Sequence, residues 1–536
     1  EEVKTLIMNI EKKPKSLILH PFLFAIFPIV SLFSQNLDLL SLNEIIFPLI
    51  LFLVISAAAW IILRYTFKNS IKSGIIISIV WFIFFSYGYL FSVFDLTIFY
   101  SINFIQQHLV LMIPFIGTLV IGILVISRTK RRLNNANTIA NVIAIALIAF
   151  PLMNIGLYDF QQQDISYENY EIADLQTGVQ LYNMPNIYYI LLDEYAPQET
   201  LLDTYDFDNS EFLNFLDEQG FVAKKSYSNY PTTFQALASI LNMQYINWIS
   251  EEIGEDSTDR HSAFEITANN QVMKILKSKG YIVVNTDSGW EITRNMPIAD
   301  LNLCGENQLF NSEFLVMTIR NSILNPIYVK MFEPGMRERV LCAFSEIPEA
   351  HLKTEKPVFV FSHVMLPHGP YFWGPNGEHL TPKKTTLEGG YDRPIQGYTD
   401  QLQFANKKMK EMIEKILSST ERQSIIVIQS DTGPSTNYVT TCQTCPLEHS
   451  NVNEKMIRER MSNVSFVYFP TNKEVLYDGM TSVNSFPLIF NTFFDDNYEM
   501  LDDRIYFSLE IEPYRHVDVT EFMTEQKNID LSLWNE

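Results

Sequence analysis

The sequence predicts a multi-pass α-helical membrane domain followed by an α/β domain with a mostly parallel sheet sandwiched by helices. Long apolar runs occupy much of residues 1–157, whereas short apolar runs that end in polar residues recur from residue 185 onward. Charge divides near the same place. The residues up to Thr138 hold 11 of the 39 Lys/Arg and 6 of the 61 Asp/Glu, a balance of +5 that leaves −27 for the remainder.

Five apolar runs have the length and composition of membrane-spanning helices. Each is close to the roughly 20 apolar residues that cross the hydrocarbon core, and none contains Asp, Glu, Lys or Arg. The runs are Ser16–Phe33, Ile45–Leu63, Ile75–Phe94, Leu109–Ile126 and Ile139–Leu157. We therefore expect a five-helix transmembrane domain over residues 1–157, a linker over 158–184 and an extracytoplasmic α/β domain over 185–536.

The loops predict the orientation of these helices. Lys and Arg cluster before the first run, between the second and third, and between the fourth and fifth, whereas the other two loops carry acidic residues only. The positive-inside rule then places the N-terminus in the cytoplasm and, after five spans, the large C-terminal domain outside the cell.

Charge also argues against two classes of function. A strongly acidic domain lacks the clustered Lys and Arg that binding to nucleic acid phosphates requires, so we expect no nucleic acid partner. A transporter is disfavoured because the apolar runs contain no charged residue to mark an ion or proton pathway.

In the second half, predicted strands that end at polar residues alternate with predicted helices, a pattern typical of a mostly parallel sheet covered on both faces. The helices are Ser210–Gln219, Phe234–Met243, Asn270–Ser278 and Leu402–Leu417. The strands are Asn186–Leu192 before Asp193, Tyr281–Asn285 near Asp287, Val358–Ser362 before His363, and Ser424–Gln429 close to Asp431. Since ligands bind beyond the carboxyl ends of such strands, Asp193, His363 and Asp431 should converge.

Two further segments carry groups suited to catalysis. Residues 228–233 (SNYPTT) precede a predicted helix, where a hydroxyl is most often a cap. In the functional interpretation the hydroxyl is a nucleophile, and the positive helix end and an adjacent metal lower its pKa. Residues 363–371 (HVMLPHGPY) hold two clustered histidines that could bind metal or donate to phosphate oxygens.

Four segments occur in a characteristic order: ILLDEY at 190–195, SNYPTTFQALASILN at 228–242, HVMLPHGPY at 363–371 and IIVIQSDTGP at 425–434. Together they resemble the sulfatase-like branch of the alkaline phosphatase superfamily, especially the membrane-anchored lipoteichoic acid synthases and phosphoethanolamine transferases. The tail LYDGMTSVNSFPLIFNTFF at 476–494 looks like the closing segment of such proteins. Five membrane helices before an external domain match the lipoteichoic acid synthase plan.

The resemblance implies a threonine nucleophile and a divalent metal, zinc or manganese. It makes Thr233 the nucleophile and a metal ligand, with adjacent Thr232 as the alternative. It also makes Asp193 and Asp431 metal ligands and lets His363 and His368 contact the metal or the phosphoryl oxygens.

One departure concerns the position after Asp431, where the family has histidine and this chain has Thr432. Three outcomes follow. Another histidine, such as His449, fills the metal site. Thr432, with water and Glu194, binds a harder ion. Or the protein has lost catalysis and keeps the fold as a surface protein that binds glycan or lipid.

The predicted function is a membrane-anchored, metal-dependent phosphoryl or phosphodiester transferase or hydrolase. Sulfate ester hydrolysis is disfavoured because no Cys/Ser-x-Pro-x-Arg pattern, the formylglycine setting, occurs near residue 233. The expected substrates are phosphate head groups linked to membrane lipid, polyol or glycan, and two in-line displacements through threonine would transfer them.

All four cysteines lie in the predicted external domain, where an even count favours disulfides. Cys442 and Cys445 could close a small loop, which would leave Cys304 to pair with Cys342. The alternative is a structural metal held by Cys442, Cys445 and His449.

Overall fold

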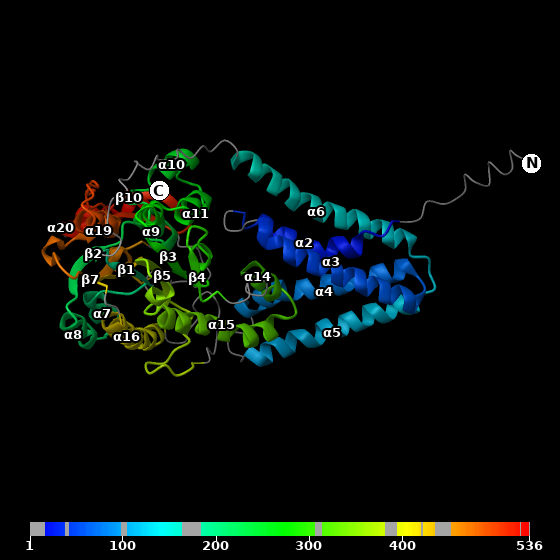
Figure 1. Ribbon diagram of the computed structural model, residues 1–536. Coiled ribbons are helices and arrows are strands. Elements are labelled where there is room, and N and C mark those ends of the chain that lie inside the picture. Colours follow the sequence, from blue (N-terminus) through cyan, green and yellow to red (C-terminus); the bar gives the residue numbers. More distant parts are fainter. Residues whose placement is uncertain are drawn as a thin grey trace, which may run out of the picture. The chain divides into compact units, whose positions relative to one another are not determined.

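The computed structural model describes residues 17–37, 42–97, 104–162, 184–305, 313–380, 394–419, 422–434, 452–525 and 527–534. The chain forms two compact units, one α-helical and one α/β (Figure 1). The first comprises Glu1–Tyr167 and Asn307–Phe332, and the second comprises Glu168–Glu306 and Glu333–Glu536. Residues 307–332 thus group with the first unit, although the sequence pattern places them within the external domain.

Apolar helices build the first unit. Within the described residues, four of them are long and apolar enough to cross a membrane, while α2 has only 15 residues. Four of the five predicted spans thus coincide with helices of spanning length, and the first coincides with a shorter apolar helix. Their bounds are α2 (His20–Ser34), α3 (Leu42–Phe67), α4 (Ser70–Thr97), α5 (Phe104–Arg128) and α6 (Asn134–Gln162).

Contacts at its N-terminus explain why α2 begins at His20 and not at Ser16, where the first predicted span begins. Pro21 lies in the first turn, which favours a helix start there. The Asn141 side chain in α6 accepts hydrogen bonds from the backbone N–H groups of Leu19 and His20, each at 3.0 Å. These bonds satisfy donors of the first turn, so the apolar residues before His20 stay outside the helix. At the other end of this unit, α6 continues into the predicted linker, of which residues 163–183 lie outside the described residues.

An eight-stranded sheet forms the centre of the second unit, in the order β4-β3-β5-β1-β6-β7-β2-β8. Neighbouring strands from β4 to β6 pair in parallel, and β7 pairs antiparallel with both β6 and β2. The predicted mostly parallel sheet is confirmed. The bounds are β1 (Asn186–Asp193), β2 (Val222–Tyr227), β3 (Ile282–Thr286), β4 (Leu301–Leu303), β5 (Val358–Pro367), β6 (Ser424–Ser430), β7 (Ser462–Tyr468) and β8 (Met480–Thr481).

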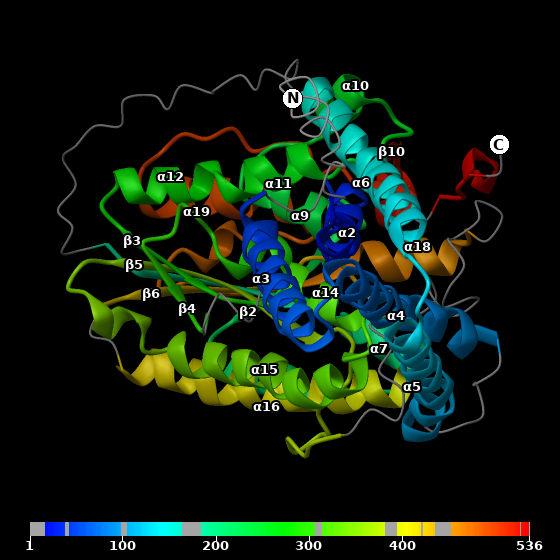
Figure 2. The ribbon, with the colours of Figure 1, turned by 90° about the vertical axis from the view of Figure 1, so that its right-hand side faces the viewer.

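The central strand β1 is buried on both faces because its side chains alternate between two cores. Tyr188, Ile190 and Leu192 contribute to one core and Ile187, Tyr189 and Leu191 to the other. In Figure 2 the helices α12 and α19 lie on one side of the sheet, and α15 and α16 lie on the other. The α/β part of the chain includes the helices α7 (Gln198–Tyr205), α8 (Ser210–Glu218), α9 (Thr233–Ile240), α12 (Gln271–Ser278), α15 (Asn325–Glu346), α16 (Pro394–Ser419), α18 (Glu454–Met461) and α19 (Ser485–Phe493).

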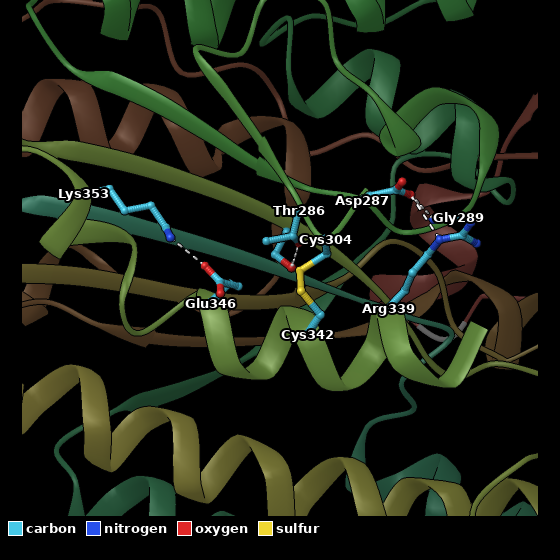
Figure 3. The surroundings of a disulfide bond; sticks show 9 residues. Thr286, Asp287, Gly289, Cys304, Arg339, Cys342, Glu346 and Lys353 are labelled. Carbon is cyan, nitrogen blue, oxygen red and sulfur yellow. Dashed lines mark hydrogen bonds and ion pairs between the residues drawn. A yellow bond between two sulfur atoms is a disulfide. The ribbon is translucent and has the colours of Figure 1, made fainter. Parts of the chain in front are cut away.

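A disulfide joins Cys304, which follows β4, to Cys342 in α15 (Figure 3). The predicted pairing of these two cysteines is confirmed, whereas Cys442 and Cys445 lie outside the described residues. Beside the disulfide, the Asp287 carboxylate accepts a hydrogen bond from the Gly289 N–H at 2.7 Å and lies 3.9 Å from the Arg339 guanidinium.

Reduction of Cys304–Cys342 is expected to destabilise the second unit. The bond closes a loop with a sequence separation of 38 residues, for which the chain-entropy model gives roughly 4 kcal/mol. Chemical denaturation of the full chain in detergent, with and without reductant, measures this change. The variant Cys304→Ser/Cys342→Ser serves as the control, and a reductant effect as large in this variant as in the wild type would contradict the assignment.

Candidate active site

Three metal-ligand side chains meet at the carboxyl ends of adjacent parallel strands. Asp193 ends β1, His363 lies in β5, and Asp431 follows β6. The ligand atoms of the three residues lie within 4.8 Å of one another, and each residue is at most 3% exposed. The structure therefore brings together the three residues that the strand pattern predicts to converge.

The pairing of β1 with β5 includes an irregularity at this point. Leu192 pairs with Val364, whereas the next residue, Asp193, pairs with Pro367. Such a break in register re-aims the side chains beside it. The sequence prediction ended this strand at Ser362, but β5 continues to Pro367, so His363 lies within the strand.

The donor set fits a divalent cation. The buried side-chain atoms without a hydrogen-bond partner in the described residues include Asp193 Oδ1, His363 Nε2 and Thr432 Oγ1. The other ring nitrogen of His363, Nδ1, lies 2.9 Å from Thr293 Oγ1, which fixes the ring and leaves Nε2 directed at the carboxylates. Two carboxylates and one imidazole are ordinary ligands of zinc and manganese.

Burial shifts the protonation of these ligands in the absence of a cation. It raises the pKa of Asp193 to about 8, with neighbouring acidic groups adding to the rise. It lowers the pKa of His363 to about 4, so this imidazole is neutral, as metal binding requires. A carboxyl group this costly to ionise is characteristic of a position that a cation stabilises.

Thr233 is the hydroxyl next to this cluster. It is the first residue of α9, and its hydroxyl donates to Asp431 Oδ2 at 2.6 Å. The hydroxyl of adjacent Thr232 instead donates to Gln235 Oε1, also at 2.6 Å. Only Thr233 contacts a candidate metal ligand in these hydrogen bonds, which favours it over the alternative nucleophile.

Glu194 connects the cluster to a residue that the sequence pattern did not indicate. Its backbone N–H donates to Asp431 Oδ1 at 3.1 Å, and its carboxylate lies 2.5 Å from the Arg460 guanidinium. Arg460 also donates to the carbonyl oxygens of Pro231 at 2.6 Å and Gly433 at 2.8 Å. One guanidinium thereby joins the loops that carry Asp193, Thr233 and Asp431.

The two remaining predicted site residues, His368 and His449, are not among the buried residues of this cluster that the structure describes. His368 is 40% exposed, and its Nε2 lies 4.0 Å from Glu194 Oε1. Burial alone would lower the pKa of His368, but the Asp193 and Glu194 carboxylates raise it to about 9. His449 lies outside the described residues.

No protein-family model and no curated protein matches this chain. Solved structures do. The integral membrane lipooligosaccharide phosphoethanolamine transferase A (EptA) of Neisseria meningitidis is similar over 91% of each chain, with 13% identity and a TM-score of 0.40. The C-terminal periplasmic domain of EcEptC from Escherichia coli covers 64% of this chain and 95% of its own, with 11% identity and a TM-score of 0.41.

Two further matches carry information on ligands and chemistry of those proteins. A second structure of the EcEptC domain is a complex with zinc. The phosphonate monoester hydrolase SpPMH from Silicibacter pomeroyi is similar over 57% of this chain and 73% of its own, with 12% identity and a TM-score of 0.38. These TM-scores are all below 0.5.

Proposed function

We propose that this chain is a membrane-anchored, metal-dependent phosphoryl or phosphodiester transferase or hydrolase with Thr233 as its nucleophile. The observation that carries the proposal is the 2.6 Å hydrogen bond from Thr233 to Asp431, within a buried group of two carboxylates and one imidazole. Its substrates are phosphate head groups linked to lipid or glycan at the outer face of the membrane, where the positive-inside rule puts this domain.

Each residue has a defined role in two in-line displacements. Asp431 Oδ2 orients the Thr233 hydroxyl and takes its proton as the threonine oxygen attacks phosphorus and the bond to the leaving oxygen breaks. His368, partly exposed beside the site, donates a proton to that leaving oxygen. An acceptor hydroxyl or water then gives its proton back to His368 and displaces the threonine, whose oxygen takes its proton back from Asp431.

A divalent ion, zinc or manganese, held by Asp193, His363 and Asp431, would stabilise the charge on the threonine oxygen and the phosphoryl oxygens. His363 offers the imidazole that the family supplies after Asp431, which argues against lost catalysis despite Thr432. The pairing of Glu194 with Arg460 argues against Glu194 as a ligand.

The direct experiment measures hydrolysis of a chromogenic phosphodiester by the full chain in detergent, with manganese or zinc added. We expect activity that a chelator removes and that either ion restores. A folded protein without activity under any of these conditions would overturn the proposal and favour a surface protein that binds glycan or lipid.

Metal binding is also expected to stabilise the protein, because an ion that binds only the folded chain adds free energy of unfolding. At a concentration of 100 Kd this gain is about 2.7 kcal/mol. Thermal unfolding with and without the ion measures it. Asp193→Asn should abolish the gain, whereas Asp217→Asn, at an exposed position, should keep it. Equal gains in both variants would show that the ion binds elsewhere.

A further inference from the structure

Residues 307–332 are an excursion of the chain between its two units. The chain before and after them, up to Glu306 and from Glu333, belongs to the second unit, whereas the excursion itself belongs to the first. Its described part contains α14 (Glu313–Arg320) and the turn that leads to α15. The two units are therefore connected at three points of the chain rather than only at residues 167–168.

The described part of the excursion packs against the membrane helices, and three of its contacts carry the argument. Phe314 is fully buried, and its ring meets that of Phe33 in α2 edge-on at a centroid distance of 6.5 Å. Farther along, the N–H of Ile323 donates to the carbonyl oxygen of Phe84 in α4 at 2.9 Å.

Gly88 in α4 provides the third contact. A Cβ atom at this position would lie 2.5 Å from the backbone of Asn321, so only glycine permits this close approach. Two different membrane helices thus contribute a ring, a carbonyl group and a glycine to the same excursion. An accidental contact through one exposed side chain would not involve an aromatic ring, a backbone carbonyl group and a glycine at once.

The disulfide closes the base of the excursion. Cys304 precedes it, Cys342 follows it, and both cysteines belong to the second unit. The covalent bond limits how far the two ends can separate, and so reduces the conformational entropy lost when the excursion docks.

We propose that residues 313–332, the described part of the excursion, are a docking segment, by which the α/β unit binds the membrane helices α2 and α4 independently of the linker. Phe314 is its apolar anchor, and Cys304–Cys342 is the clamp at its base. The linker by itself is one covalent connection between the two units, and the docking segment adds a second attachment that requires no catalytic activity.

The test separates the two attachments by cutting the linker. A specific protease site is inserted near residue 175 of the full chain, and the purified protein is cleaved in mild detergent. We expect the N-terminal fragment to remain bound to the C-terminal fragment, which carries the docking segment, through affinity purification on a tag at either end. If the two fragments of the cleaved wild-type protein separated completely, the proposal would be overturned.

Variants assign the attachment to the docking segment. Phe314→Asp should release the fragments after cleavage, whereas Leu324→Asp, at a position 39% exposed, should not. Gly88→Leu tests the same contact from the membrane side and decides the question if Phe314→Asp does not fold. Fragments that stay together in both Phe314→Asp and Gly88→Leu would show that another contact holds them. Reduction of the disulfide should increase the rate of fragment dissociation in the wild-type sequence.

Discussion

Replacing Thr233 by alanine is expected to lower the rate of phosphodiester cleavage by on the order of a thousandfold or more, the scale seen when a nucleophile is removed. The substitution deletes the only atom proposed to bond to phosphorus, and it removes the hydroxyl that Asp431 orients at 2.6 Å. Because this hydroxyl is only partly buried at the start of α9, the alanine variant should keep its fold and its metal-dependent stabilisation.

Two neighbouring substitutions make this result specific. Thr233→Ser retains the hydroxyl and should retain measurable activity. Thr232→Ala removes a hydroxyl that donates to Gln235 and not to Asp431, and it should cost far less activity. If Thr232→Ala were the inactive variant and Thr233→Ala remained active, the assignment of the nucleophile would be wrong. Initial rates at saturating metal distinguish these outcomes.

Replacing Arg460 by methionine is expected to lower the free energy of unfolding by about 3–5 kcal/mol, the usual cost of removing one partner of a buried ion pair. The side chains of Arg460 and Glu194 are only 11% and 9% exposed. The variant leaves the Glu194 carboxylate without this cation and deprives the carbonyl groups of Pro231 and Gly433 of a donor. Activity should fall with stability, since these carbonyls belong to the loops of Thr233 and Asp431.

A second substitution tests the cause of this loss. Glu194→Gln in the Arg460→Met background removes the carboxylate charge that Arg460 no longer offsets. It should recover part of the stability, so the two effects should not be additive. Lys455→Met, at an exposed position of the same helix α18, provides the matched control. Denaturant titrations of the wild type, the single variants Arg460→Met and Glu194→Gln, and the double variant give the coupling energy. Simple additivity would contradict the proposed pair.

The sequence predicted the central part of the site because parallel strands obey a simple rule. Each of β1, β5 and β6 is a short apolar run next to a polar ligand residue, and the carboxyl ends of neighbouring parallel strands meet at one edge of the sheet. The rule needs no knowledge of the strand order. It therefore placed Asp193, His363 and Asp431 together, although it did not show that β5 continues beyond His363.

Other parts of the molecule had no such local signal. Arg460 belongs to the stretch EKMIRERM of α18, where charged residues on a helix are usually solvated, and only the tertiary fold directs this one toward three loops. The stretch EFLVMTIR of α14 resembles any amphipathic surface helix, so its burial against membrane helices could not be anticipated. The start of α2 depends on Asn141, a residue more than 100 positions away.

The position of β1 at the centre of the sheet has a consequence for how the protein folds. Ile187 pairs with Phe359 in β5 and with Ile425 in β6, partners that follow it by 172 and 238 residues. Such distant parallel pairing makes folding slow, since long loops must close before the contacts are gained. During synthesis β1 emerges first, and its apolar residues must wait for both neighbours while exposed to other chains. We therefore expect the α/β unit to be most prone to aggregation in the interval before β6 has been made.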